Sequence, residues 1–115
     1  MAVEQSPVLV MITDAQARIE YVNPHFSAVI GYGREEVIGK NPRFLQSGQT
    51  HPETYRQLWD TLTAGQIWAG ELQNRRKDGC LYWEETRISP ITDETGQITH
   101  YVGIKFDITD QKGRQ

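Results

Sequence analysis

Cysteine is almost absent from the 115-residue sequence, which contains only Cys80. A single thiol excludes an internal disulfide and fits a reducing compartment, so we expect a cytoplasmic protein. Long hydrophobic runs are also missing, because VLVMI at 8–12 falls far short of the about 20 residues that cross a membrane. No basic and apolar signal peptide precedes this run, and we expect no membrane contact by this domain.

A strong charge of either sign is missing as well, since 12 Lys and Arg stand against 15 Asp and Glu, a net charge of −3. Without a basic patch there is no electrostatic footprint for nucleic acid, and we expect no such partner. The motifs G-x-S-x-G and H-E-x-x-H and the phosphate loop do not occur, so we expect a regulatory protein and not an enzyme. The three histidines are scattered without metal-ligand spacing, and none is placed as an axial ligand, so neither a metal nor haem is expected.

The residues that are present have a globular composition, with 37% hydrophobic, 23% charged and 10% aromatic residues. The length suits one domain with one core. We therefore expect a single domain over residues 1–115, with a core at about 4–111 and a polar tail at 110–115 that begins a linker.

The N-terminal part predicts a hairpin followed by a helix. Residues 8–14 are apolar and β-rich, a polar turn follows, and residues 19–23 alternate between apolar and polar side chains. Asn23 and Pro24 are typical of an N-cap and a first helical position. Gly31 is expected to end this helix.

Two further helical segments are predicted in the middle of the chain. Residues 34–38 form a short turn, and Pro42 then prevents helix continuation by removing an N–H donor. Thr50 and Glu53 match a capping box, which predicts a helix from Thr50 to Gly65. Its apolar side chains recur at helical spacing on one face: Tyr55, Leu58, Trp59 and Leu62.

The C-terminal half predicts three strands in a meander. They cover residues 67–76, 81–91 and 97–109, with turns at 77–79 and 93–96. Joined to the first hairpin, they make a five-stranded antiparallel sheet with short helices on one face, which is an α+β fold.

The last predicted strand has two different faces. One carries Tyr101, Gly103 and Lys105, and the other carries Val102, Ile104 and Phe106. The second set is apolar, whereas one face of an antiparallel sheet is usually wet. We expect it to pack against a flanking helix or a second subunit, so a homodimer is predicted.

Several strings in the sequence resemble PAS domains over about residues 4–111. They include YVNPHF, GYGREEVIGKNPRFLQSG, WAGELQNRRKDG, YWE and the terminal FDIT. The resemblance implies a PAS fold and a sensory module of the kind found in histidine kinases, cyclic-di-nucleotide enzymes and transcription regulators, which controls an output domain in the same chain. It also implies that Asp107 and Thr109 transmit the signal from the last strand, although both residue types commonly cap strand ends as well.

NPRFLQ is similar to the signature of light-sensing LOV domains, in which a cysteine attacks bound flavin. Arg43 and Gln46 match its phosphate-binding and ring-binding residues, but Pro42 stands where the thiol would be. The family's two further amides correspond to Glu84 and Lys105, whose opposite charges could pair with each other. The resemblance therefore implies a LOV-like domain in which the covalent photochemistry is not expected.

The chain also resembles NifL-type redox-sensing PAS domains, which bind FAD without a cysteine. An acidic residue of that group is replaced by Pro42, and a small polar one by Met11. The candidate cofactor-binding residues are Asn41, Arg43, Gln46, Trp59, Trp68, Asn74, Glu84 and Lys105. Each of these residues also has a purely structural interpretation, as a surface Arg, a core aromatic, an amide satisfied by the backbone or a member of an ion pair. The expected function is a PAS sensor that binds FAD for redox sensing, and the alternative is a cofactor-free PAS domain that acts by dimerisation or binds a small metabolite.

Overall fold

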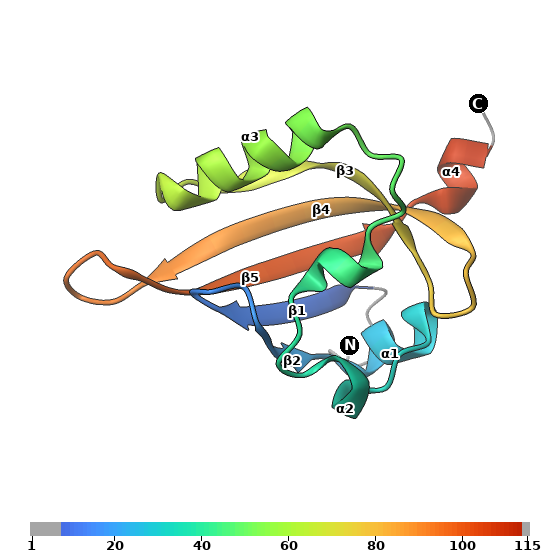
Figure 1. Cartoon of the computed structure of the whole chain (residues 1–115), viewed down its shortest axis with the longest axis horizontal. Coiled ribbons are helices and arrows are strands. Elements are labelled where there is room, and N and C mark those ends of the chain that lie inside the picture. The colour runs from blue at the N-terminus through green and yellow to red at the C-terminus, as the bar shows by residue number, and fades with distance from the viewer. Residues whose placement is uncertain (1–7, 114–115) are drawn as a thin grey trace.

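A computed structural model of the chain describes residues 8–113 and contains one antiparallel sheet of five strands in the order β2-β1-β5-β4-β3 (Figure 1). The strands are β1 (Leu9–Asp14), β2 (Ile19–Val22), β3 (Trp68–Arg75), β4 (Leu81–Thr92) and β5 (Ile98–Asp107). The helices are α1 (Pro24–Ile30), α2 (Arg34–Val37), the 3₁₀ helix η2 (Pro42–Leu45), α3 (Pro52–Thr63) and α4 (Thr109–Gly113). The predicted α+β fold with its five-stranded antiparallel sheet is confirmed.

One aspartate organises each of the three hairpins. The Oδ1 atoms of Asp14, Asp78 and Asp93 accept backbone N–H groups two residues ahead, at 2.8–2.9 Å. Hydrogen bonds hold the pKa values of all three carboxyls below their ordinary range, chiefly from the N–H of Arg18 at Asp14, the N–H of Cys80 at Asp78 and the hydroxyl of Thr95 at Asp93. Glycines at positive φ complete the turns after Asp78 and Asp93.

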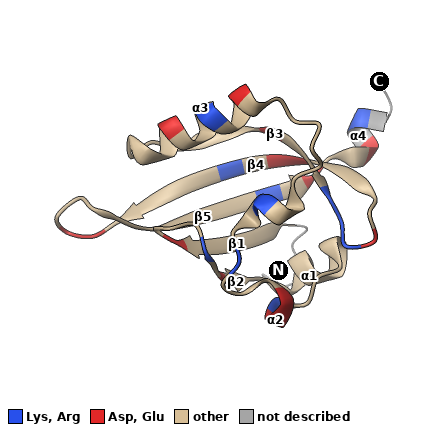
Figure 2. Ribbon diagram, viewed as in Figure 1, with Lys and Arg blue, Asp and Glu red and all other residues tan. Residues whose placement is uncertain are grey.

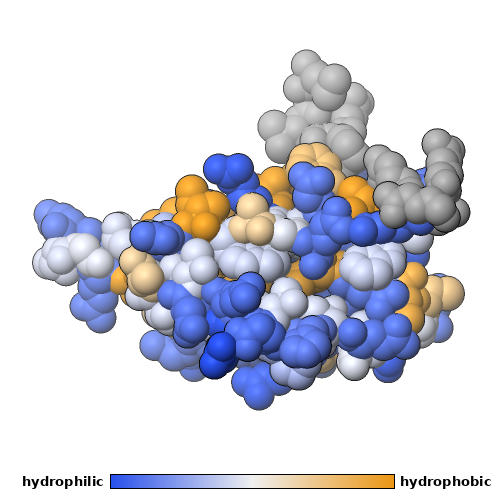
Figure 3. Space-filling view, turned by 90° about the horizontal axis from the view of Figure 1, so that it is seen from above, coloured by the Kyte–Doolittle hydropathy of each residue, from blue (hydrophilic) through white to orange (hydrophobic). Residues whose placement is uncertain are grey.

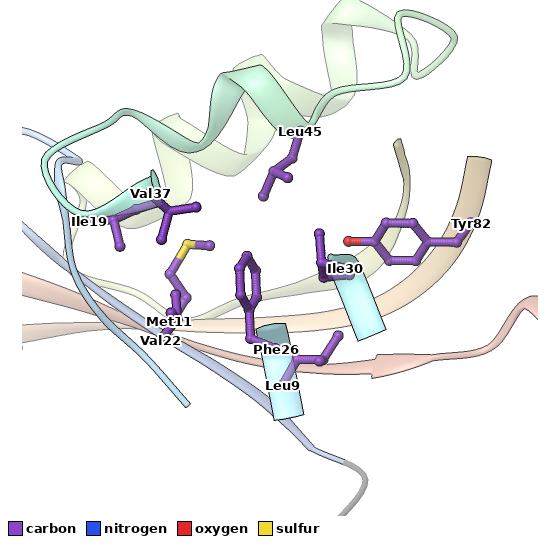
Figure 4. Close-up of a cluster of buried hydrophobic side chains, with 9 residues drawn as sticks. All are labelled: Leu9, Met11, Ile19, Val22, Phe26, Ile30, Val37, Leu45 and Tyr82. Carbon is purple, nitrogen blue, oxygen red and sulfur yellow. The ribbon is translucent and has the colours of Figure 1, made fainter. Parts of the chain in front are cut away.

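The helices place side chains against the sheet in two groups. α1 contacts β1 and α2 contacts β2, whereas α3 lies over β3 and β4 (Figure 1). Figure 4 shows the first group of buried side chains, in which residues from β1, β2 and the first helices surround Phe26. The second group lies under α3 and comprises Leu58, Leu62, Leu72 and Tyr101. The space between these two groups is where the candidate site lies.

The predicted start of the long helix at Thr50 is wrong. His51 is the N-cap of α3, because its Nδ1 accepts the N–H of Glu53 at 3.1 Å. The hydroxyl of Thr50 lies beside β3 and hydrogen-bonds to the main-chain oxygen and nitrogen of Gln73, at 3.3 and 3.4 Å. A tertiary contact therefore takes the side chain that the local pattern assigned to the cap.

Two other boundaries also differ from prediction. The last strand ends at Asp107 and not at 109, because α4 begins at Thr109 and continues into the tail that was predicted as linker. Pro42 ends no helix, since α2 already stops at Val37; it opens η2, where Asn41 is the N-cap. The expected core start at residue 4 lies outside the described residues, and the domain limits stay a prediction.

The surface carries mixed charges. Two acidic residues flank one basic residue along α3 in Figure 2, and hydrophilic residues separate small hydrophobic groups on the face of Figure 3. Within residues 8–113, no helix is long and apolar enough to cross a membrane.

Candidate functional site

A cavity of about 110 Å³ lies between the helices and the inner face of the sheet. Its opening is bordered by three exposed residues, Arg43, Gln46 and Trp59. The interior is largely apolar and draws on β1, η2, α3, β3 and β4, with Met11, Leu45, Leu58, Leu62, Leu72 and Ile88 as its apolar walls. Elements far apart in sequence therefore combine to form one partly enclosed site.

Three of the polar side chains that line this cavity come from α3, β3 and β5. Asn74 on β3 is only 4% exposed, and the backbone of Gln46 pairs with its strand. The hydroxyl of Tyr55 is buried and has no hydrogen-bond partner within the described part of the chain. Burial raises the pKa of this phenol, although the nearby hydroxyl of Thr50 acts in the opposite direction; that hydroxyl is bonded to the backbone of Gln73 and makes no regular hydrogen bond to Tyr55. A ligand oxygen or nitrogen could satisfy the Tyr55 hydroxyl.

The third polar side chain, Lys105 on β5, belongs to a buried ion pair. Its Nζ lies 3.2 Å from Oε2 of Glu84, and the two side chains are 9% and 0% exposed. Glu84 also accepts hydrogen bonds from Tyr82 at 2.9 Å and Thr86 at 2.6 Å. Burial, together with the negative charge of Glu84, raises the pKa of Tyr82 far above its ordinary value. The predicted pairing of Glu84 with Lys105 is confirmed.

Six of the eight candidate cofactor-binding residues line the cavity: Asn41, Arg43, Gln46, Trp59, Asn74 and Lys105. The side chain of Asn41 accepts the N–H of Arg43 at 3.0 Å, so it also holds the start of η2 in place. Trp59 is 39% exposed and meets the ring of Tyr101 edge to face at 5.5 Å. It is therefore at the mouth of the cavity and not in its depth.

Trp68 and Glu84 are not among the residues that line the cavity, and their role in binding a cofactor stays a prediction. The indole of Trp68 lies along its own strand over Gly70, where an added Cβ would come within 2.8 Å of ring carbons. Glu84 is drawn behind Lys105 by the hydroxyls of Tyr82 and Thr86. Both residues have the predicted inward parity, but local packing turns them away.

Tyr55 and Gly103 are among the lining residues that were not predicted as site residues. Tyr55 was read as part of the apolar stripe of α3, although its hydroxyl signalled the need for a polar partner. Gly103 shares the face of Lys105, and an added Cβ there would lie 3.4 Å from Cε of Lys105 and 3.7 Å from the oxygen of Met11. Strand parity could have identified Gly103.

No thiol stands at the cavity. Cys80 is exposed just before β4 and does not line the site, and Pro42 occupies the wall. The neighbouring carboxylate of Asp78 raises the pKa of the Cys80 thiol, which disfavours the reactive thiolate. Covalent attack by this thiol on a ligand in the cavity has no geometric support.

A second polar cluster ties the end of β5 to α4. The Oδ1 of Asp107 accepts the N–H and the hydroxyl of Thr109 at 2.9 and 2.6 Å, and Oδ2 pairs with Arg76. Burial opposes ionisation of Asp107, but the bonds from Thr109 and the charge of Arg76 outweigh it and lower the pKa. Thr109 in turn accepts the N–H of Trp83 at 3.0 Å. The two residues predicted to transmit the signal thus join β5, β4 and α4.

Val102, Ile104 and Phe106 lie on the face of the sheet opposite the cavity, as their parity predicts. Val102 and Ile104 are half-buried, and Phe106 is 40% exposed. On the same face, Lys112 of α4 pairs with Glu71 at 2.5 Å and lies 4.9 Å from the ring centre of Trp83.

Comparison with known proteins matches residues 7–110 to the PAS domain family. The chain is 41% identical to a nitrogen fixation regulatory protein of Klebsiella oxytoca over 93% of its own length and 22% of that protein. It is 36% identical to blue-light-activated histidine kinase 1 of Erythrobacter litoralis, over 93% of this chain and 31% of the kinase.

Solved structures give the same result. An RNA-binding light-oxygen-voltage receptor superposes with a TM-score of 0.88 at 31% identity, over 96% of this chain and 32% of that one. A light-oxygen-voltage domain studied with a flavin analogue superposes at 0.84 and 28% identity, over 92% and 81%. The chain spans less than a third of each of the two curated relatives named above. It belongs to the PAS family of sensory domains found in signalling proteins.

Proposed function

We propose that this PAS domain binds a flavin, with FAD as the leading candidate, and acts as a cytoplasmic redox sensor for an output domain in the same chain. The main support is the unpartnered hydroxyl of Tyr55 in an apolar cavity that also presents Asn74 and Lys105. Further support comes from the similarity to a light-oxygen-voltage domain that has been studied with a flavin analogue.

The chemistry of the lining fits a flavin. Apolar walls suit a flat aromatic ring, and Tyr55, Asn74 and Lys105 offer hydrogen bonds to its oxygen and nitrogen atoms. Arg43 is exposed at the mouth, where a guanidinium could hold a phosphate with two parallel hydrogen bonds. The residues that would hold the group are thus arranged from the inside of the cavity to its opening.

A bound flavin would supply a redox-active ring that accepts and returns electrons. The protein's part is to hold and orient that ring and to limit its contact with water. Leu45, Leu58 and Leu62 provide the dry wall, and Trp59 shields the mouth. Pro42 supplies no nucleophile, so binding would rest on non-covalent contacts alone.

The second candidate is a cofactor-free PAS domain that binds a small metabolite or acts as a homodimer. The cavity of about 110 Å³ favours it, because pockets for drug-sized ligands measure on the order of 300–1,000 Å³. A flavin would therefore require Trp59 or Gln46 to move outward. The apolar outer side chains Val102, Ile104 and Phe106 support the dimer.

An absorption spectrum separates the two candidates. The protein, purified and then incubated with FAD and desalted, is expected to keep a flavin band at ~450 nm. Light scattering on the same sample gives the mass in solution. A colourless protein that loses all added FAD ends the flavin proposal, and a dimeric mass for that sample supports the second candidate.

We also propose that Asp107 and Thr109 pass the signal from the sheet to the segment after β5. Thr109→Val keeps the shape but removes the acceptor of the Trp83 N–H and one donor to Asp107. Loss of these bonds is expected to speed amide hydrogen exchange at Trp83 and residues 109–112 by roughly tenfold, which corresponds to about 1.4 kcal/mol.

Hydrogen exchange followed by mass spectrometry checks this expectation. Thr95→Val is the matched control, because Thr95 makes a similar hydroxyl bond to Asp93 in the turn between β4 and β5. It should leave exchange at residues 109–112 unchanged. Equal exchange in wild-type protein and Thr109→Val would show that the hydroxyl does not hold α4.

A further inference from the structure

The buried pair has a defined orientation toward the cavity. Lys105 lines the cavity, whereas Glu84 lies behind it and is fully buried. The carboxylate of Glu84 receives hydrogen bonds from Tyr82 and Thr86 in addition to the ammonium of Lys105. Glu84 is thus well satisfied, and the positive end of a neutral pair faces the ligand space.

Lys105 keeps donors to spare. An ammonium group carries three N–H donors, and the partner of Lys105 in the described part of the chain is Glu84. The remaining donors lie at the cavity, whose walls are largely apolar. A buried ammonium with unused donors is stabilised by any acceptor that a ligand brings.

We propose that the inner end of the cavity, at Lys105, selects an uncharged carbonyl-type acceptor of the ligand and rejects a carboxylate of the same shape at that position, whereas a charged group of the ligand would lie at the mouth near Arg43. A carboxylate would place a second negative charge next to a lysine whose charge Glu84 already balances. One positive group would then serve two anions in a place of low dielectric, which is strongly unfavourable. Glu84 makes Lys105 a hydrogen-bond donor and not a receptor for anions.

This inference rests on the proposed function of the cavity as a ligand-binding site and narrows the class of ligand. The same hydrogen bond from Lys105 can be made to a carbonyl of a flavin or to the carbonyl of a smaller amide. It is tested with two probes of equal shape, isobutyramide and isobutyrate, titrated into the whole chain at pH 7 and followed by NMR. Each probe is about the size of benzene, and the cavity of about 110 Å³ is open at its mouth, so a probe need not be fully enclosed. Wild-type protein is expected to bind the amide at least about tenfold more tightly than the acid.

Substitutions at the pair give opposite expected results. Glu84→Gln keeps a polar group for Tyr82 and Thr86 but frees the charge of Lys105, so isobutyrate should now bind more tightly than isobutyramide. The double variant E84Q/K105M should bind isobutyramide more weakly than wild type, because the carbonyl loses its donor, and unchanged affinity for the amide would overturn the proposal. Lys77→Met is the matched control, because Lys77 pairs with Glu36 on the surface away from the cavity, and its preference should equal that of wild type.

Lys105→Met alone does not serve this test, because it leaves the carboxylate of Glu84 unpaired beside the cavity, whereas E84Q/K105M leaves no charge without a partner. The proposal is overturned if wild type binds neither probe, binds both equally or prefers isobutyrate, or if Glu84→Gln keeps the amide preference. FAD retention is measured on the same wild-type sample. Loss of FAD with an intact amide preference ends the flavin proposal and supports this one.

Discussion

Lys105→Met is expected to lower the free energy of unfolding by about 3–5 kcal/mol, because it leaves the fully buried carboxylate of Glu84 without its counter-charge. The hydroxyls of Tyr82 and Thr86 remain but carry no full charge. The double variant E84Q/K105M should recover most of this loss, since an uncharged amide can still bond to both hydroxyls. Urea unfolding of the three proteins measures the difference.

The control for this prediction is Lys77→Met, which breaks an exposed lysine–glutamate pair. Its side chains are 50% and 36% exposed, and such pairs contribute about 0–1 kcal/mol. A Lys105→Met variant no less stable than Lys77→Met would mean that water reaches Glu84 in solution. Non-additivity between the Glu84 and Lys105 substitutions would give the coupling energy of the pair.

The sequence carried enough information for the fold because the elements follow local rules. Alternation marked the strands, and Asn23 with Pro24 marked the start of α1. The failures came where a distant residue competes. Thr50 fits a capping box, yet Gln73, more than twenty residues away, takes its hydroxyl. The end of β5 was missed because the apolar alternation continues past Asp107, whereas Thr109 bonds back to β4.

The candidate site could be predicted only in part. The resemblance to LOV domains placed Glu84 and Lys105 at two of the family's amide positions, and their opposite charges suggested the pairing that the structure confirms. The sequence could not tell which partner faces the cavity, because depth depends on the bonds from Tyr82 and Thr86. Nor could it show that Gly70 leaves room for Trp68 to lie along its strand.

Asn23→Ala is expected to lower the free energy of unfolding by roughly 3 kcal/mol, more than the about 1 kcal/mol typical of a lost N-cap. The Oδ1 of Asn23 accepts the N–H of Phe26 at 3.2 Å, which is the predicted cap, and also that of Val10 at 3.0 Å. Its Nδ2 donates to the oxygen of Val8 at 2.9 Å. One side chain thus caps α1 and fixes it to the start of β1.

Asn23→Ser separates these two roles, because serine caps helices well but is too short to bond to Phe26 and the β1 backbone together. Urea unfolding should place it between wild type and Asn23→Ala. If the serine variant matches wild type, capping alone explains the residue and the bonds to Val8 and Val10 contribute little. If it matches the alanine variant, the link to β1 dominates. The intermediate result is expected because the serine variant loses the bonds to the N–H of Val10 and the oxygen of Val8. Asn23 is only 8% exposed, so water has little access to replace these two hydrogen bonds.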